Sequence, residues 1–187
     1  MYQICVSGAA KGESVQEGRD LAKATGAAIA RAGHSLLTGA TIGLPNVAAE
    51  AYKAHGGTMS VGISPASSKI EHVMKYRLPT EAYDTILYTG LHYVGRDSLL
   101  IASSDAVISI GGRLGTLHEF TIAMELDTPI GILVGAGGVS TEIDDVLRAA
   151  GIERSKNAFF SDDPAVLLDM LITELNQRNK PYKKLYS

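Results

Sequence analysis

The sequence has no tryptophan and only one cysteine, and aromatic residues make up just 6% of its 187 residues. A single cysteine excludes an internal disulfide and any zinc site built from several cysteines. Because Cys5 lies in an apolar run, we interpret it as a small buried hydrophobic residue. The core must therefore be built mainly from Ala, Ile, Leu and Val, and the 20 glycines favour α/β layers joined by tight turns.

Positive charge and long apolar runs are also scarce. The 17 Lys and Arg residues are outnumbered by 20 Asp and Glu, which argues against an extended nucleic-acid partner. No apolar run approaches membrane-spanning length, and the first residues lack the basic region and long apolar core of a signal peptide. We therefore expect a cytoplasmic protein with no membrane partner. Residues 1–187 would form one Rossmann-like nucleotide-binding domain, with residues 180–187 as a tail that is mobile or docked on a neighbour.

Short apolar runs alternate with helical patterns along the chain. The expected strands cover residues 4–6, 35–37, 58–63, 84–88, 106–110, 130–134 and 158–160. The expected helices cover residues 14–32, 47–55, 93–102, a segment after the turn at 111–115, 140–151 and 163–179, with a short helix near 69–76 inside a loop at 66–82. Continuous apolar strands alternating with helices are typical of a parallel sheet. We expect an α/β, Rossmann-like, doubly wound fold, its mainly parallel sheet carrying helices on both faces.

The most informative stretch is residues 104–125, which reads as a strand, a glycine turn and a helix. Such a turn aims free backbone N–H groups and the positive end of a helix at one point, where an anion such as phosphate binds well. The expected strands at residues 4–6 and 35–37 are also followed by glycine-bearing loops, which cover residues 7–12 and 38–43. Because the carboxyl ends of parallel strands meet at one edge, we expect a pocket there for a small nucleotide.

Neither a dinucleotide-binding G-x-G-x-x-G pattern with its acidic partner nor a G-x-x-x-x-G-K-[ST] loop is present. NAD use and P-loop chemistry are therefore unsupported, and we expect no cofactor. The histidines show no metal-ligand spacing, so we expect no metal site.

The sequence G-G-R-L-G-T-L-H-E at residues 111–119 resembles the P-G-G-x-G-T-x-x-E signature of the LOG ("Lonely Guy") family of cytokinin-activating phosphoribohydrolases. Arg96 stands at the family's spacing before this turn, and T-G-A-T-I-G-L at 38–44 resembles its G-G-G-x-x-G-L loop. The chain departs from the signature at Gly111 and Arg113, has Ala40 in place of a glycine, and lacks the lysine after the arginine. These departures make it similar also to the neighbouring molybdenum-cofactor-carrier-like branch.

The resemblance implies that Arg96 and Glu119 are catalytic and act at an N-glycosidic bond. It implies that the phosphate or nucleotide is bound by Ser7, Gly8, Gly39, Gly43, Gly111, Gly112, Arg113, Gly115 and Thr116. It also implies a homodimer with the helix of Arg96 near the interface. One function is then cleavage of a nucleoside 5′-monophosphate, such as AMP or a cytokinin riboside monophosphate, to base and ribose 5-phosphate. The other is a non-catalytic carrier or sensor of a nucleotide or of the molybdenum cofactor.

Each of these side chains also has a purely structural interpretation. Glu119, expected in the first turn of its helix, would be favoured there by the helix dipole. Arg96 alone would be a solvated helix charge and Thr116 a helix cap. Arg113 either contacts the phosphate or points to solvent. His118 is expected in a structural or solvent-facing role, because its direction differs from that of Glu119 by about a quarter-turn.

Overall fold

The computed structural model describes residues 1–152 and 157–185. In this part of the chain seven strands form one sheet in the order β4-β3-β2-β1-β5-β6-β7, and all neighbouring pairs are parallel. The strands are β1 (Gln3–Gly8), β2 (Ser35–Thr38), β3 (Ser60–Ser64), β4 (Thr85–Tyr88), β5 (Ala106–Ile110), β6 (Ile130–Leu133) and β7 (Ala158–Ser161). The sequence-based α/β prediction is therefore confirmed.

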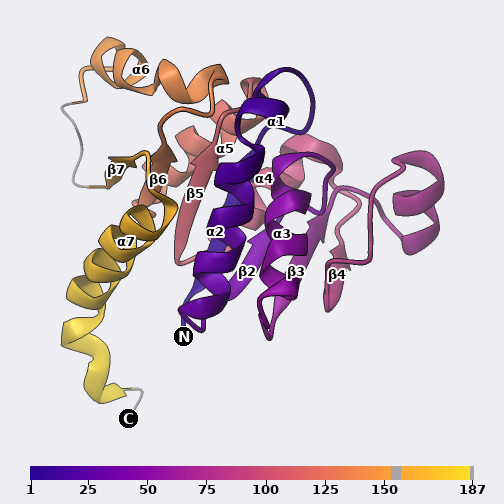
Figure 1. Cartoon of the computed structure of the whole chain (residues 1–187), viewed down its shortest axis with the longest axis horizontal. Helices are drawn as coiled ribbons and strands as arrows, with labels where there is room; N and C mark the ends of the chain where they lie inside the picture. The colour runs from indigo at the N-terminus through magenta and orange to yellow at the C-terminus, as the bar shows by residue number, and fades with distance from the viewer. Residues whose placement is uncertain (153–156, 186–187) are drawn as a thin grey trace.

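Helices cover both faces of this sheet (Figure 1). One face carries α2 (Arg19–Arg31), α3 (Leu44–Ala54) and α7 (Pro164–Asn179), and the other carries α4 (His92–Ala102) and α5 (Leu114–Glu125). The alternation of strand side chains divides the core accordingly. Ile4 and Val6 of β1 pack in the layer under α2 and α3, whereas Cys5 packs in the layer under α4 and α5.

The strand order reverses at the centre of the sheet. β1 has β2 on one side and β5 on the other, with Gly8 paired to Ile110 at the end of both strands. The chain leaves β1 toward α2 on one face and leaves β5 toward α5 on the other, so the two loops separate above this point. In open α/β sheets a crevice forms at such a reversal, and ligands bind there.

Several helix boundaries differ from the predictions. The helix expected over 14–32 is divided at Gly18 into α1 (Ser14–Glu17) and α2. A Cβ on Gly18 would come within 2.7 Å of Leu44, so the division accompanies close packing of the chain against α3. The helix after β5 begins at Leu114, which places Glu119 in its second turn rather than its first.

The C-terminal third follows its local signals closely. After a 3-10 turn, η2 (Gly138–Thr141), α6 covers Ile143–Ala149. The last helix begins as expected, because the Asp163 carboxylate accepts hydrogen bonds from the N–H groups of Ala165 and Val166, with Pro164 in the first turn. It continues into a second 3-10 segment, η3 (Lys180–Leu185); residues 186 and 187 of the predicted tail lie outside the described residues.

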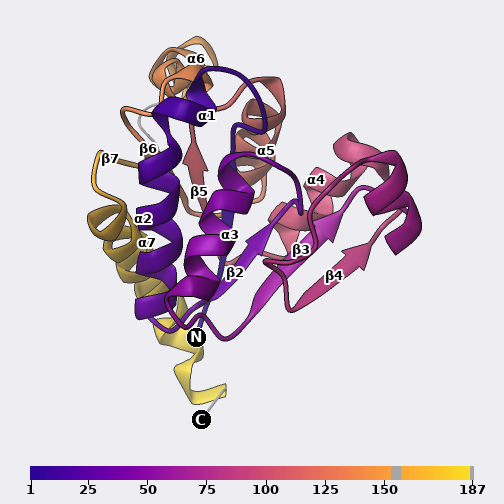
Figure 2. The ribbon, with the colours of Figure 1, turned by 45° about the vertical axis from the view of Figure 1, so that its right-hand side comes forward.

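The segment expected as a loop with a short helix contains one π-helical turn, η1 (Glu71–Lys75), and projects beyond β4 in Figure 2. His72 anchors it with no exposed surface. Its Nε2–H donates to the Pro79 carbonyl at 3.0 Å, so Nδ1 accepts from the Ser64 hydroxyl at 2.8 Å. None of the described helices has the length and apolar character needed to cross a membrane.

Candidate functional site

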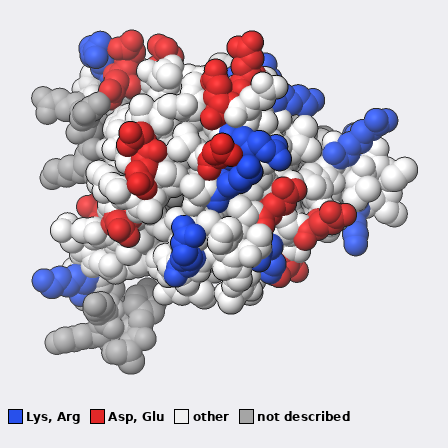
Figure 3. All heavy atoms as spheres, viewed as in Figure 1, with Lys and Arg blue, Asp and Glu red and all other residues white. Residues whose placement is uncertain are grey.

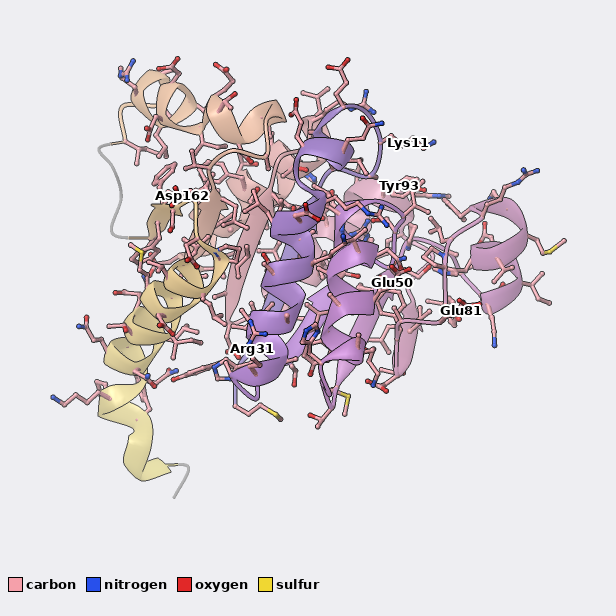
Figure 4. All side chains as sticks on the ribbon, in the orientation of Figure 1. Lys11, Arg31, Glu50, Glu81, Tyr93 and Asp162 are labelled. Carbon is pink, nitrogen blue, oxygen red and sulfur yellow. The ribbon has the colours of Figure 1, made fainter. Side chains whose placement is uncertain are left out.

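A cavity of about 210 Å³ lies above the carboxyl ends of the central strands. Loops after β1, β2 and β5 line it together with α4 and α5; the lining residues are Gly8, Ala9, Ala10, Lys11, Thr41, Tyr93, Arg96, Asp97, Arg113, Gly115, Thr116 and Glu119. Lys11 and Tyr93 are labelled at this end of the molecule in Figure 4, whereas Arg31 lies at the opposite end. The cavity is therefore at the place where the strand order reverses.

Three charged side chains are buried together in the cavity wall. Arg96 and Asp97 of α4 are 3% and 5% exposed, and Glu119 of α5 is 8% exposed. Arg96 Nη1 donates to Glu119 Oε1 at 3.3 Å and lies 3.3 Å from Asp97 Oδ1. Two carboxylates thus share one guanidinium nitrogen, an arrangement far from the solvated charge that Arg96 alone suggests.

Ser7 contacts the same carboxylate from the end of β1. Side-chain alternation places Ser7, like Cys5, on the face under α4 and α5, and its hydroxyl donates a short hydrogen bond to Glu119 Oε2. Burial raises the pKa of Glu119 to about 7, while the positive charge of Arg96 acts to lower it. A carboxyl group with this pKa exchanges its proton near neutral pH, which is the property of a general base or acid.

Arg96 is confined by the loop after β2. A Cβ on Gly39 would lie 2.0 Å from Arg96 Nη1, so only glycine leaves room for the guanidinium there. Arg96 Nε is buried without a hydrogen-bond partner in the described part of the chain. One N–H of the guanidinium thus has no acceptor among the described residues.

The glycine turn after β5 brings the N-terminus of α5 to the cavity. Gly111 and Gly112 have φ of 58° and 95°, and a Cβ on Gly112 would lie 2.0 Å from Thr116 Oγ1. Both carbonyls accept hydrogen bonds from the segment after β6. Ser140 Oγ donates to the Gly111 carbonyl at 3.1 Å, and the Val139 N–H donates to the Gly112 carbonyl at 2.9 Å. The turn is thus held from behind, and the first N–H groups of α5 lie beside the cavity, as an anion site requires.

Positive charge at the cavity is local. Lys11 and Arg113 are exposed and line its wall. Elsewhere on the face shown in Figure 3, acidic and basic side chains are interspersed. The arrangement suits a small anionic ligand.

A model of the SLOG cluster4 family matches residues 1–165. The chain belongs to the SLOG cluster4 family. An uncharacterized protein of Archaeoglobus fulgidus is 34% identical over 125 residues, which cover 67% of this chain and 75% of that protein. The family model confirms the resemblance to LOG-like proteins that the sequence motifs suggested.

Solved structures share the fold of this SLOG cluster4 chain. The X-ray structure of TM1055, a structural genomics target, has a TM-score of 0.79 at 24% identity and covers 93% of this chain and 99% of its own. The molybdenum cofactor carrier protein of Chlamydomonas reinhardtii has a TM-score of 0.74 at 23% identity, and the match covers 95% of this chain and 98% of that chain. The molybdenum cofactor binding protein of Rippkaea orientalis has a TM-score of 0.71 at 24% identity, and the match covers 92% of this chain and 96% of that chain.

Most of the site residues proposed from the sequence meet in this SLOG cluster4 fold. Of the predicted residues, those that line the cavity are Gly8, Arg96, Arg113, Gly115, Thr116 and Glu119. Ser7 donates a hydrogen bond to Glu119, and Gly39 lies against the guanidinium of Arg96. Gly43, Gly111 and Gly112 do not line it. Gly43 is the N-cap of α3, has a φ of 83° and lies against the Ala9 carbonyl. Gly111 and Gly112, which also have positive φ, form the turn between β5 and α5.

The structure also decides between some of the structural interpretations. Arg113 occupies the N-cap position of α5, so Thr116, in the first turn, is not its cap. Glu119 is the sixth residue of that helix and is buried, so the helix dipole does not explain it.

Asp97 lines the cavity but was missed by sequence reasoning. It accepts from His118 Nδ1–H at 2.8 Å, and His118 is partly exposed beside Glu119. Its only sequence signal is its place directly after Arg96, and nothing local connects positions 97 and 118. Thr41 was missed as well, in a loop already expected at the pocket. Among residues 1–152 and 157–185, no cluster of three His, Cys, Asp or Glu side chains could hold a metal ion.

Proposed function

We propose that this protein is a LOG-like phosphoribohydrolase that cleaves the N-glycosidic bond of a nucleoside 5′-monophosphate. The observation that carries the proposal is the buried contact between Arg96 and Glu119 beside the N-terminus of α5. It supports a site in which a phosphate is bound by the helix N-terminus and Thr116, while a carboxylate lies in the same cavity.

The chemistry requires one water molecule and no further reactant. Its oxygen forms a bond to the ribose C1′ as the bond from C1′ to the base nitrogen breaks. The base leaves with that electron pair, and overall water supplies its hydroxyl to the sugar and its proton to the base. Positive charge develops on the sugar during this step, so the Glu119 carboxylate would stabilise it and accept the proton of the water.

Arg96 has the second role in this proposal. Its buried guanidinium holds Glu119 in place and keeps Nε–H as a free donor for a phosphate or ribose oxygen. Arg113 and Lys11, exposed at the cavity, would attract the phosphate by their charge.

Incubation of the purified protein with AMP and with cytokinin riboside monophosphates, followed by chromatography of free base, tests this function. Glu119→Gln should lose at least about a hundredfold in rate, because general-base catalysis contributes roughly that much. The matched control is Glu125→Gln, an exposed position at the end of the same helix, which should release base like the unchanged protein. Equal nucleotide binding by Glu119→Gln and by the unchanged protein, with no base released by either, would refute the hydrolase function.

A carrier function is the second candidate, and one observation favours it. Solved structures with this fold are described as molybdenum cofactor carrier and binding proteins. The same cavity would then hold a phosphorylated cofactor as cargo. Native mass spectrometry and the ultraviolet spectrum of freshly purified protein test this function, which predicts a bound ligand; the bare polypeptide mass with no absorbance beyond that of tyrosine would count against it.

The same proposal includes a homodimer that uses α4. The helix that carries Arg96 has exposed apolar side chains at Val94 and Leu99, and Leu91 at its N-cap is exposed as well. Ile70 and Met74, at and within the η1 segment, are also exposed apolar side chains, and the ring of Tyr76, which follows η1, meets the Tyr93 ring of α4 edge-on. Exposed apolar clusters of this kind are typical of protein interfaces.

A further inference from the structure

Five side chains form a continuous row from the interior to the surface of the site. Ser7 bonds to Glu119, Glu119 to Arg96, Arg96 contacts Asp97, and Asp97 accepts from His118. Only the last member is partly exposed, with 38% of its side chain accessible. The proposed reaction gives roles to Glu119 and Arg96, whereas the outer two members of the row, Asp97 and His118, have none in it.

The geometry at Arg96 indicates the role of Asp97 and His118. Nη1 lies 3.3 Å from Glu119 Oε1 and 3.3 Å from Asp97 Oδ1, so neither carboxylate has this nitrogen to itself. Asp97 cannot turn away, because its other oxygen is held by His118 Nδ1–H at 2.8 Å. A guanidinium shared in this way neutralises Glu119 only in part.

We infer that Asp97 and His118 are positioning residues that set the charge of Glu119: Asp97 competes with it for Arg96, and His118 keeps Asp97 in that competing position. This inference rests on the proposed hydrolysis for its purpose but not for its test. Without Asp97, Arg96 would pair with Glu119 alone and hold it as a carboxylate even in acid. With Asp97, the carboxyl group can take up and release a proton near neutral pH.

Titratable and charged groups face Glu119 from several elements, and Lys11, Tyr93 and Arg113 line the same cavity. From β1 come the Ser7 hydroxyl and the Cys5 thiol, whose pKa burial raises well above its ordinary value, so the thiol stays uncharged. From α4 come Arg96 and Asp97, and from α5 comes His118. The Asp97 charge acts to raise the pKa of Glu119, and positive charge on His118 acts to lower it. His118 thus acts on Glu119 both through positive charge and through its hold on Asp97.

The test measures Glu119 directly in the ligand-free protein. Glutamate carrying ¹³C in its carboxyl group is incorporated, the Glu119 signal is identified by its absence in Glu119→Gln, and its titration midpoint is followed by NMR. In Asp97→Asn the midpoint should fall by about one pH unit, the size expected when a nearby like charge is removed. Asp97→Glu should restore a high midpoint, and Asp20→Asn, which removes an exposed charge on α2, should leave it unchanged.

His118→Gln keeps a hydrogen-bond donor but cannot become charged, so it should move the midpoint upward. Because His118 is near the surface, this variant also tests the inference if Asp97→Asn does not fold, as judged by circular dichroism. A midpoint that stays fixed in both variants would overturn the inference, whatever the enzyme assay shows. If base release is observed, the acidic limb of its kcat profile should shift with the midpoint while KM stays constant; if no base is released, the hydrolase proposal fails separately.

Discussion

The guanidinium of Arg96 lies against the backbone of Gly39 with no room for a side chain between them. Nη1 is 2.0 Å from where a Cβ of residue 39 would be. Gly39 directly follows β2, two strands away from the turn that leads into α5. The loop after β2 therefore fixes the position of a charge that acts on Glu119.

Gly39→Ala should displace Arg96 and separate it from Glu119. The backbone at residue 39 does not need glycine for a positive φ, so the fold should survive. We expect loss of nucleotide binding or base release by at least about tenfold, since displacing a buried charged hydrogen bond costs roughly 1.5–3 kcal/mol. Isothermal calorimetry with AMP and a thermal melt measure the two effects. Unchanged affinity would show that Arg96 does not position the ligand or Glu119.

Glu119→Gln should stabilise the protein above neutral pH. The pKa of Glu119 is raised from its ordinary value of 4.5 to about 7, so its protonated form favours folding below pH 4.5, and this contribution is lost as the pH rises through 7. At pH 8 the variant should be more stable by up to about 3 kcal/mol, and the difference should vanish near pH 4. Urea unfolding at several pH values checks this. Glu125→Gln serves as the control and should show no such trend.

Gly115→Ala separates binding from stability. A Cβ at this helical position would meet nothing within 4 Å, and alanine is the better helix former. The free energy of unfolding should therefore rise by up to about 1 kcal/mol, and the melting temperature should rise with it. The added methyl would stand at the wall of the cavity, beside the helix N-terminus, and should weaken phosphate binding. Thr121→Ala, at an exposed position of the same helix, should raise stability without any loss of affinity.

His72→Leu should loosen the η1 segment. The substitution leaves the buried Ser64 hydroxyl and the Pro79 carbonyl without the ring that joins them, at a cost of about 3 kcal/mol. Chemical unfolding and limited proteolysis of residues 65–82 would measure this loss. Lys75→Ala removes an exposed ion pair with Glu71 and a cation–π contact with the Tyr76 ring, and it should change stability by less than about 1 kcal/mol.

Val94→Glu tests the proposed dimer. Val94 is 71% exposed on α4, and a charge there would be buried in the interface. Light scattering coupled to gel filtration should show a dimer for the unchanged protein and a monomer for the variant. Val166→Glu, at an exposed apolar position of α7, should remain a dimer. A monomer before any substitution would refute the homodimer.

Local signals in the sequence were sufficient for the fold and for the sheet edge at which the cavity lies. Continuous apolar runs such as 106–110 predict buried parallel strands, and Asp163 with Pro164 marks the start of the last helix, because both signals depend only on neighbouring residues. The glycine loops predict the sheet edge where a ligand would bind, since parallel strands all end there.

Side-chain partners required the tertiary structure. Ser7 and Glu119 are 112 residues apart, and Asp97 and His118 are 21 apart on different helices. Which loops meet depends on the strand order, and hydrophobic periodicity is the same for many orders. Burial follows from the same packing. It places the guanidinium of Arg96 between the carboxylates of Asp97 and Glu119, and it raises the pKa of Glu119. The sequence alone thus determined the helices and strands and the sheet edge at which the cavity lies. Long-range packing decided the charges at that edge, because desolvation and pairing exist only once the chain has folded.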